Sequence, residues 1–358
     1  MATLVLKQIE RGSVTTSTTD VTNTVTLTTT LTDTAKTVLI FSAKCASNGS
    51  INFNILGRVL STTQIQFERA ATPAVACTIE YQVIEFISGI SVQHLYFQQA
   101  TATTATTIST VTLANTFAMI SHKGAGSGWG GDDLFYADLT TTTNLNTVGT
   151  ATQASAQLAV QVIQIDNASV QKVSTTLSTS SATTDVTVTT IDPAKTFWVF
   201  SQSTSVTQNA EQNSYLSYVN STTLRYTRAL AAGAGSSMLA YVVSLSSGVS
   251  VQNITTTISA SSNTVSPTIS SVTVADTALL ANGIYQRFAS ASLADDDAGY
   301  VAFALASLNT TSFTATRASS PATAATINVQ VLEFNGGLSD ISDSLLQKRK
   351  QSMAMLAR

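Results

Sequence analysis

The chain has 358 residues, of which 44% are hydrophobic and only 10% are charged, against roughly 25% charged residues in an ordinary soluble protein. Its 17 basic and 20 acidic residues leave a net charge of −3, so no positive field exists for a nucleic-acid backbone, and nucleic acid is not an expected partner. No apolar run reaches the roughly 18 residues of a membrane span, and Lys7 breaks the N-terminal apolar run. We therefore expect neither membrane insertion nor a secretory signal.

An internal repeat with a period near 80 residues extends from the N-terminus to about residue 337. Four landmarks recur in the same order. The first is a Ser-Val-Gln triplet, ending at Gln93, Gln171 and Gln252. The second is a threonine before an apolar strand, at Thr37, Thr116, Thr196 and Thr277, in steps of 79, 80 and 81. The third is an arginine before alanine, at Arg69, Arg228 and Arg317, with Gly149 near that position in the second repeat. The fourth is a closing apolar strand, starting at Gln82, Gln161, Tyr241 and Gln330.

Each repeat is expected to form six or seven short strands. Polar and apolar residues alternate in 51–56 and 78–86, which puts one side of each strand in a core and the other in water. Turn residues separate the strands, as at 47–50, which is typical of a two-sheet sandwich.

The predicted fold is therefore all-β, with four tandem small antiparallel β-sandwich modules and a short C-terminal helix. The modules are predicted at 1–89, 90–167, 168–248 and 249–337, and the helical tail at 338–358. The spacers between repeats are short, which favours a semi-rigid rod over flexibly linked beads.

The tail can form an amphipathic helix. Ser339 or Asp340 can cap its start, and Ile341, Leu345, Met353 and Leu356 fall near one face. An isolated helix of this length is marginal unless its apolar stripe is covered. We interpret it as a docking or self-association helix, and a frayed end is the alternative.

Catalytic chemistry has little support in the sequence. His94 lies at a repeat junction and His122 is expected in a loop beside Lys123, and neither has a matching nucleophile motif. Cys45 and Cys77 are too few for a disulfide framework, so we expect buried free thiols. The spacing of these residues resembles no zinc site, and we predict no cofactor, no metal site and no enzyme activity.

Several residues remain as candidates for contact with a partner. Asp132, Asp133 and, within Asp295–Asp297, Asp296 are expected in turns. The first alternative is that these carboxylates contact calcium or a partner. The second alternative is that they act as the general acid and base of a glycosidase. Trp129 lies in the glycine-rich stretch 124–131. It could contact a sugar face or a protein partner, or fold back onto its own module.

Two further features have simpler interpretations. Trp198 takes the place of an apolar strand residue and is expected to be packed. The repeated arginines are expected to cover the sandwich edge with their stems, the alternative being a shared ligand site in each module.

The order of strands resembles the small β-sandwich units of tailed-bacteriophage virion proteins, which are distantly similar to H-type lectin domains. The resemblance is carried by Thr34-Ala35-Lys36-Thr37 with its apolar strand, a Thr-Thr strand, and Val83-Ile84-Glu85-Phe86. It implies a non-enzymatic virion structural protein: a capsid decoration, head fibre, neck or tail appendage. Such a protein is made in the host cytoplasm and resides in the virion, in contact with copies of itself and other virion proteins.

Two other hypotheses remain open. The chain could be a carbohydrate-binding adhesin that touches a host surface glycan through Trp129. It could also be a cellular surface-layer or fibre protein that is exported by another route.

Overall fold

The computed structural model describes residues 3–45, 54–69, 75–124, 134–149, 155–204, 213–228, 231, 235–281, 288–290, 302–317 and 324–335. Among these residues the regular elements are antiparallel strands and a few short 3-10 turns, so the predicted all-β fold of small sandwiches is confirmed. The predicted helical tail, with Ile341, Leu345, Met353 and Leu356, lies outside the described residues.

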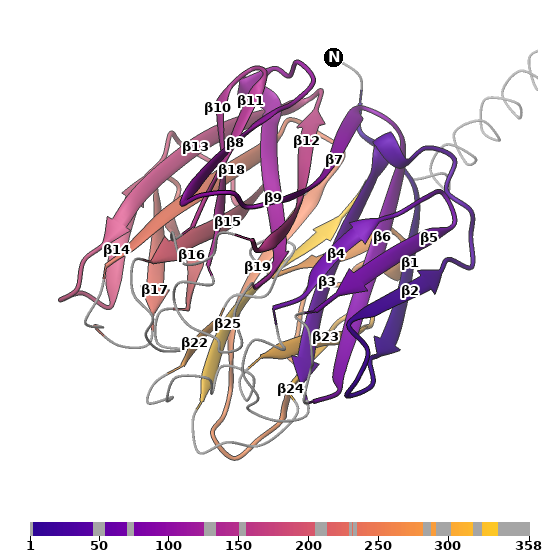
Figure 1. The fold of residues 1–358 in the computed structure, drawn as a ribbon. Helices are drawn as coiled ribbons and strands as arrows, with labels where there is room; N and C mark the ends of the chain where they lie inside the picture. The colour runs from indigo at the N-terminus through magenta and orange to yellow at the C-terminus, as the bar shows by residue number, and fades with distance from the viewer. Residues whose placement is uncertain are drawn as a thin grey trace, which may run out of the picture.

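Module 1 is a pair of three-stranded sheets (Figure 1). Its strands are β1 (Val5–Thr15), β2 (Thr22–Thr26), β3 (Thr37–Cys45), β4 (Leu56–Val59), β5 (Gln64–Glu68) and β6 (Cys77–Ser88). One sheet has the order β1-β6-β3 and the other β2-β5-β4. Strand β2 alternates between exposed and half-buried residues, as the period-2 pattern predicts for a strand with one wet face.

The next three modules repeat this order. Module 2 contains β7 (Ile90–Gln98), β8 (Thr103–Thr107), β9 (Thr116–Lys123), β10 (Tyr136–Thr141), β11 (Asn144–Val148) and β12 (Gln157–Ile165). Module 3 contains β13 (Ala168–Leu177), β14 (Thr183–Thr187), β15 (Thr196–Thr204), β16 (Ser214–Asn220), β17 (Thr223–Arg228) and β18 (Ser236–Leu245). Module 4 contains β19 (Ser250–Ile258), β20 (Thr264–Val265), β21 (Thr277–Leu280), β22 (Phe288–Ser290), β23 (Phe303–Leu308), β24 (Phe313–Arg317) and β25 (Ala325–Glu333), with β22 pairing β25.

In modules 1, 2 and 4 the threonine landmark closes a tight turn before the third strand, whereas the Thr196 hydroxyl of module 3 bonds the Ser244 hydroxyl. In module 1 the 3-10 turn η1 (Thr34–Lys36) precedes β3, and the Thr37 hydroxyl donates to Asp33 O at 2.9 Å. Thr116 and Thr277 make the same bond, to Thr112 O and Thr273 O. Because these hydroxyls are almost fully buried, each needs an internal partner, which explains why threonine recurs at this position.

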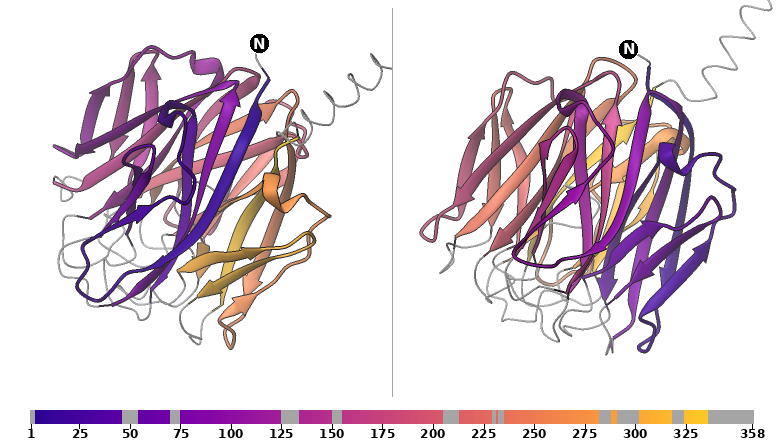
Figure 2. Two further views of the ribbon diagram at one scale, coloured as in Figure 1. Left: turned by 90° about the vertical axis from the view of Figure 1, so that its right-hand side faces the viewer. Right: turned by 45° about the horizontal axis from the view of Figure 1, so that its top comes forward.

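The modules form a closed ring, so the expectation of a rod is wrong. Strands β3 and β6 of module 1 pack against β23 of module 4, and Ser42 Oγ accepts a hydrogen bond from Leu305 N at 2.8 Å. Figure 2 shows the first and last modules side by side. Phe86 and Phe334 meet edge to face with ring centroids 5.3 Å apart. The last module therefore returns to the first.

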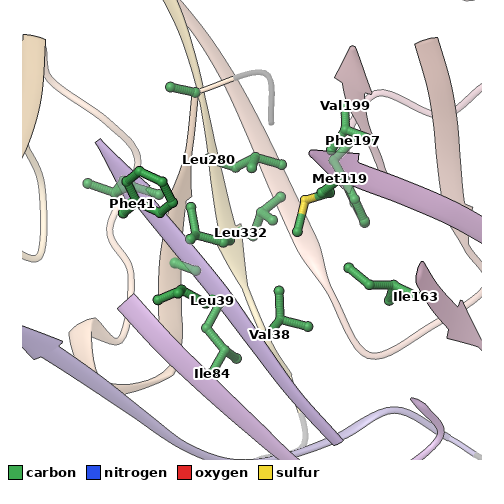
Figure 3. Packing of buried hydrophobic residues seen from close by; sticks show 14 of the residues in the cluster. Val38, Leu39, Phe41, Ile84, Met119, Ile163, Phe197, Val199, Leu280 and Leu332 are labelled. Atoms are coloured by element: carbon green, nitrogen blue, oxygen red, sulfur yellow. The ribbon is translucent and has the colours of Figure 1, made fainter. Parts of the chain in front are cut away.

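Apolar side chains from all four modules face one another in the middle of the ring, around a small cavity of about 40 Å³ (Figure 3). The third strand and the closing strand of each module turn one face toward it, so these strands are buried on both faces. The cavity is lined by Leu4, Val38, Ile40, Ile84 and Phe86 from module 1, Ile90, Phe117, Met119, Ile163 and Ile165 from module 2, Phe197 and Leu245 from module 3, and Leu280, Leu332 and Phe334 from module 4. The closing strands were expected to have one wet face; in the ring that face is dry.

Ring closure predicts that a circular permutant will fold. Asn335 N donates to Gly248 O at 3.0 Å, and a methyl group added at Gly248 would lie 3.4 Å from Leu4 O, so the two described ends flank one glycine. The permutant joins residue 335 to residue 3 by a short Gly-Ser linker and begins and ends between Asp166 and Asn167. Its free energy of unfolding should differ by no more than about 2 kcal/mol from that of the unpermuted 3–335 chain. Chemical denaturation of both chains measures this difference.

A rod would give the opposite result. Its ends would lie several modules apart, so the linker could not span them, and the permuted chain would aggregate or unfold. Failure of the permutant beside a well-folded 3–335 control would contradict the closed ring.

Candidate functional site

The junctions between modules are built by a glutamine on the closing strand. Gln161 of module 2 accepts from Leu39 N at 2.9 Å and donates to Leu39 O at 2.8 Å, both in module 1. Gln82 makes the same pair of bonds with Leu279, and Gln330 with Trp198. Each amide therefore satisfies both backbone groups of one residue on the open edge of the neighbouring module's sheet. Each glutamine faces the preceding module around the ring.

Module 3 replaces this glutamine with Tyr241. Its hydroxyl accepts from Leu139 N at 2.8 Å and donates to Ala137 O at 3.0 Å, on β10 of module 2. Burial strongly raises the pKa of Tyr241, so the hydroxyl remains a donor at all ordinary pH values. All four junctions therefore have one buried polar side chain at the same position of the repeat.

A second side chain crosses each junction from the first strand of the module. Arg11 donates to Val274 O and Thr277 O. Lys172 donates to Leu139 O at 2.9 Å, and Asn253 donates to Pro193 O at 3.2 Å. The His94 side chain bonds Thr34 O at 3.0 Å. Burial lowers the pKa of His94, so its imidazole is neutral and donates to this carbonyl through Nε2. His94 therefore contributes to the junction.

The glutamine of the Ser-Val-Gln landmark bonds within its own module and does not cross a junction. Gln252 donates to Ser270 O at 3.1 Å and accepts from Ser270 N at 2.7 Å near the surface. Gln93 and Gln171 make the corresponding bonds with Ser109 and Thr189. The repeat therefore uses one glutamine inside a module and another between modules.

The repeated arginines are buried, so the expectation that they cover the sandwich edge is wrong. Arg69, Arg228 and Arg317 are 2%, 1% and 1% exposed. Arg317 donates to Ser259 O and Ser262 O at 2.6 to 2.9 Å, and Arg228 donates to Ser178 O and Ser181 O. These guanidinium groups hold the loop after the first strand.

Module 2 shows how this role can be filled without arginine. The Gln99 side chain donates to Thr101 O at 2.7 Å and Thr147 O at 3.2 Å. A methyl group at Gly149 would lie 2.4 Å from the buried Phe135 ring, so this ring occupies the space that a side chain at position 149 would need. His122 lies in β9, packs on the Phe135 ring and is 2% exposed. The expectation that His122 lies in a loop is therefore wrong.

Cys45 and Cys77 form a disulfide, so the expectation of free thiols is wrong. The two residues are 32 apart in sequence, but antiparallel pairing of β3 with β6 places them directly opposite each other, with Cα atoms 4.0 Å apart. The spacing alone could not show this, because it depends on strand register.

Reduction of this disulfide should destabilise the chain. We expect the Cys45→Ser/Cys77→Ser double variant to lose about 2–4 kcal/mol of unfolding free energy, because the bond restricts the unfolded chain. Urea denaturation with and without a reductant measures the same loss in the natural sequence. Equal stability of the oxidised and reduced chains would contradict a structural role for the bond.

Grooves lie at two of the junctions. Between modules 1 and 4 a groove of about 280 Å³ is lined by residues that include Arg11, Ser13 and Glu80. Between modules 2 and 3 a groove of about 460 Å³ is lined by residues that include Tyr136, Asp138 and Lys172. Sequence reasoning missed both grooves, since no motif marks them.

The candidate contact residues Trp129, Asp132, Asp133 and Asp296 lie outside the described residues, and their roles stay predictions. Trp198, by contrast, is fully buried and its Nε1 donates to Leu216 O at 3.0 Å, which confirms that it is packed.

Within the described ranges, no three His, Cys, Asp or Glu side chains are grouped so that they could hold a metal ion. The part of the chain that the structure describes also has no helix long and apolar enough to cross a membrane. Neither a family model nor a curated protein matches this chain.

Proposed function

We propose that the chain is a non-enzymatic structural protein of a virion: a capsid decoration, head fibre, neck or tail appendage. The observation that supports this most is the closed ring of four sandwiches built by one chain, in which the polar residues that recur at equivalent positions bind backbone groups. Such a molecule offers shape and surface to its partners, which are other virion proteins and copies of itself.

The outer strands suit a particle surface. Exposed positions on β2, β8 and β14 are mostly threonine, at Thr22, Thr24, Thr26, Thr103, Thr107, Thr183 and Thr187. With only 10% charged residues in the chain, this exterior is hydroxylated and close to neutral, which limits long-range attraction to charged molecules.

The disulfide of module 1 fits the same proposal. Disulfides persist outside the reducing cytoplasm, including on virion surfaces. A virion protein is made in the host cytoplasm and reaches an oxidising environment when the particle is released, where Cys45 and Cys77 can pair.

Particle analysis tests the proposal. Particles purified from the cells that make this protein should contain the chain in a fixed ratio to the major shell protein, and a gold label on Arg358 should mark one position on each particle. Recovery of the chain only with the cell envelope would instead support the surface-layer hypothesis. Its absence from purified particles would reject the virion role.

A further inference from the structure

The groove between modules 2 and 3 has walls from both modules. Strand β10 of module 2 supplies Tyr136 and Asp138, while β13 and β18 of module 3 supply Lys172, Ser174, Thr175, Thr176 and Ser237–Leu239. Lys172, Ser174 and Thr176 alternate along β13 and are exposed, so they share one face. The volume of about 460 Å³ lies within the range of small-molecule sites.

The charges of this groove cancel. Lys172 Nζ lies 2.7 Å from Asp138 Oδ1, and its second bond to Leu139 O fixes the ammonium group at the junction. Burial, and then the nearby Asp138 carboxylate, raise the pKa of Tyr136, so the phenol remains neutral. The groove therefore offers no net charge to an ionic ligand.

Hydroxyl groups remain available in the groove. Among the described residues, the side chains of Ser174, Thr176 and Ser237 share no hydrogen bond with another residue. Ser237 pairs with Thr176 across the ladder, so these two hydroxyls lie side by side. Together with the Asp138 carboxylate they supply donors and acceptors next to the half-buried Tyr136 ring.

The junction between modules 1 and 2 carries an aromatic side chain, 43% exposed, at the equivalent position. Tyr96 occupies the position of Ser174, two residues after the side chain that crosses the junction. Arg58, at the position of Asp138, stacks on the Tyr96 ring at 3.9 Å from the centroid, and the Tyr96 hydroxyl bonds Glu68 at 3.3 Å. Tyr96 and Arg58 therefore stand at this junction where Ser174 and Asp138 stand at the junction between modules 2 and 3.

We infer that the groove between modules 2 and 3 binds a neutral sugar, with a hexopyranose ring against Tyr136 and its hydroxyls bonded to Asp138, Lys172, Ser174 and Ser237. A sugar combines an apolar C–H face with vicinal hydroxyls, which matches an aromatic wall beside mixed donors and acceptors. This inference is independent of the proposed virion role and of Trp129.

Ligand-observed NMR on the full chain tests the site, with glucose, galactose, mannose and their N-acetylamino forms as probes. At least one should bind the unchanged chain, with little dependence on salt because the groove has no net charge. Ser174→Tyr, which copies Tyr96 of the junction between modules 1 and 2, should weaken that binding by more than about tenfold. Thr187→Tyr makes the same change at an exposed strand position outside the groove and should leave binding unchanged.

Two further variants keep the test decisive. Asp138→Asn retains the size of the side chain and should also weaken binding, which covers the case in which Ser174→Tyr fails to fold. Trp129→Ala should bind as the unchanged chain does. The inference is overturned if none of the probes binds, if Ser174→Tyr folds and binds normally, if Asp138→Asn binds normally, or if Trp129→Ala alone abolishes binding.

Discussion

Replacement of Arg228 by alanine is expected to lower the free energy of unfolding by about 3–5 kcal/mol. The side chain is 1% exposed and donates to Ser178 O at 2.7 Å and Ser181 O at 3.1 Å. The variant removes the guanidinium donor from both carbonyls and opens a cavity inside module 3, and Ser178 O keeps only its long 3.3 Å bond from Ser181 N. Urea denaturation, followed by circular dichroism, measures the loss.

Arg225 provides the matched control on the same strand, β17. It pairs with Asp185 at 2.6 Å, but both side chains are nearly half exposed, and water replaces such a pair readily. Arg225→Ala should therefore change stability little. Similar losses in Arg225→Ala and Arg228→Ala would contradict the role that we assign to the buried guanidinium group.

Replacement of Gln330 by leucine should cost about 2–5 kcal/mol and weaken the junction between modules 3 and 4. The Gln330 amide is fully buried and forms two 2.7 Å bonds, one with Trp198 N and one with Trp198 O. Leucine is similar in size but leaves both backbone groups of Trp198 without this partner. Hydrogen exchange at the Trp198 amide should accelerate together with the loss of stability.

Gln252 is the control for this prediction. It makes the same two bonds, with Ser270 N and Ser270 O, at a site that water reaches. Gln252→Leu should therefore cost less than about 1 kcal/mol, and the Trp198 amide should exchange as before. An equal cost for both variants would show that burial of the junction is not what makes Gln330 important.

The local architecture was predictable because it depends on patterns within one repeat. Period-2 alternation and turn residues indicated the strands, and the spacing of Thr37, Thr116, Thr196 and Thr277 indicated the copies. The structure adds the reason for these landmarks: threonine closes a turn, arginine holds a loop, and glutamine covers a sheet edge. The candidate contacts at Trp129, Asp132, Asp133 and Asp296 remain predictions.

By itself, the sequence determined four similar β-sandwiches, because each forms from residues fewer than about 90 apart whose polar and apolar pattern is local. Only the tertiary structure decided that they close into a ring, that Cys45 meets Cys77, and that a groove lies open beside Ser174 between modules 2 and 3. A repeat period says that copies are alike but not how far each is rotated from the last. That rotation brings Gln82 to Leu279, 197 residues away in sequence, and no local pattern records it.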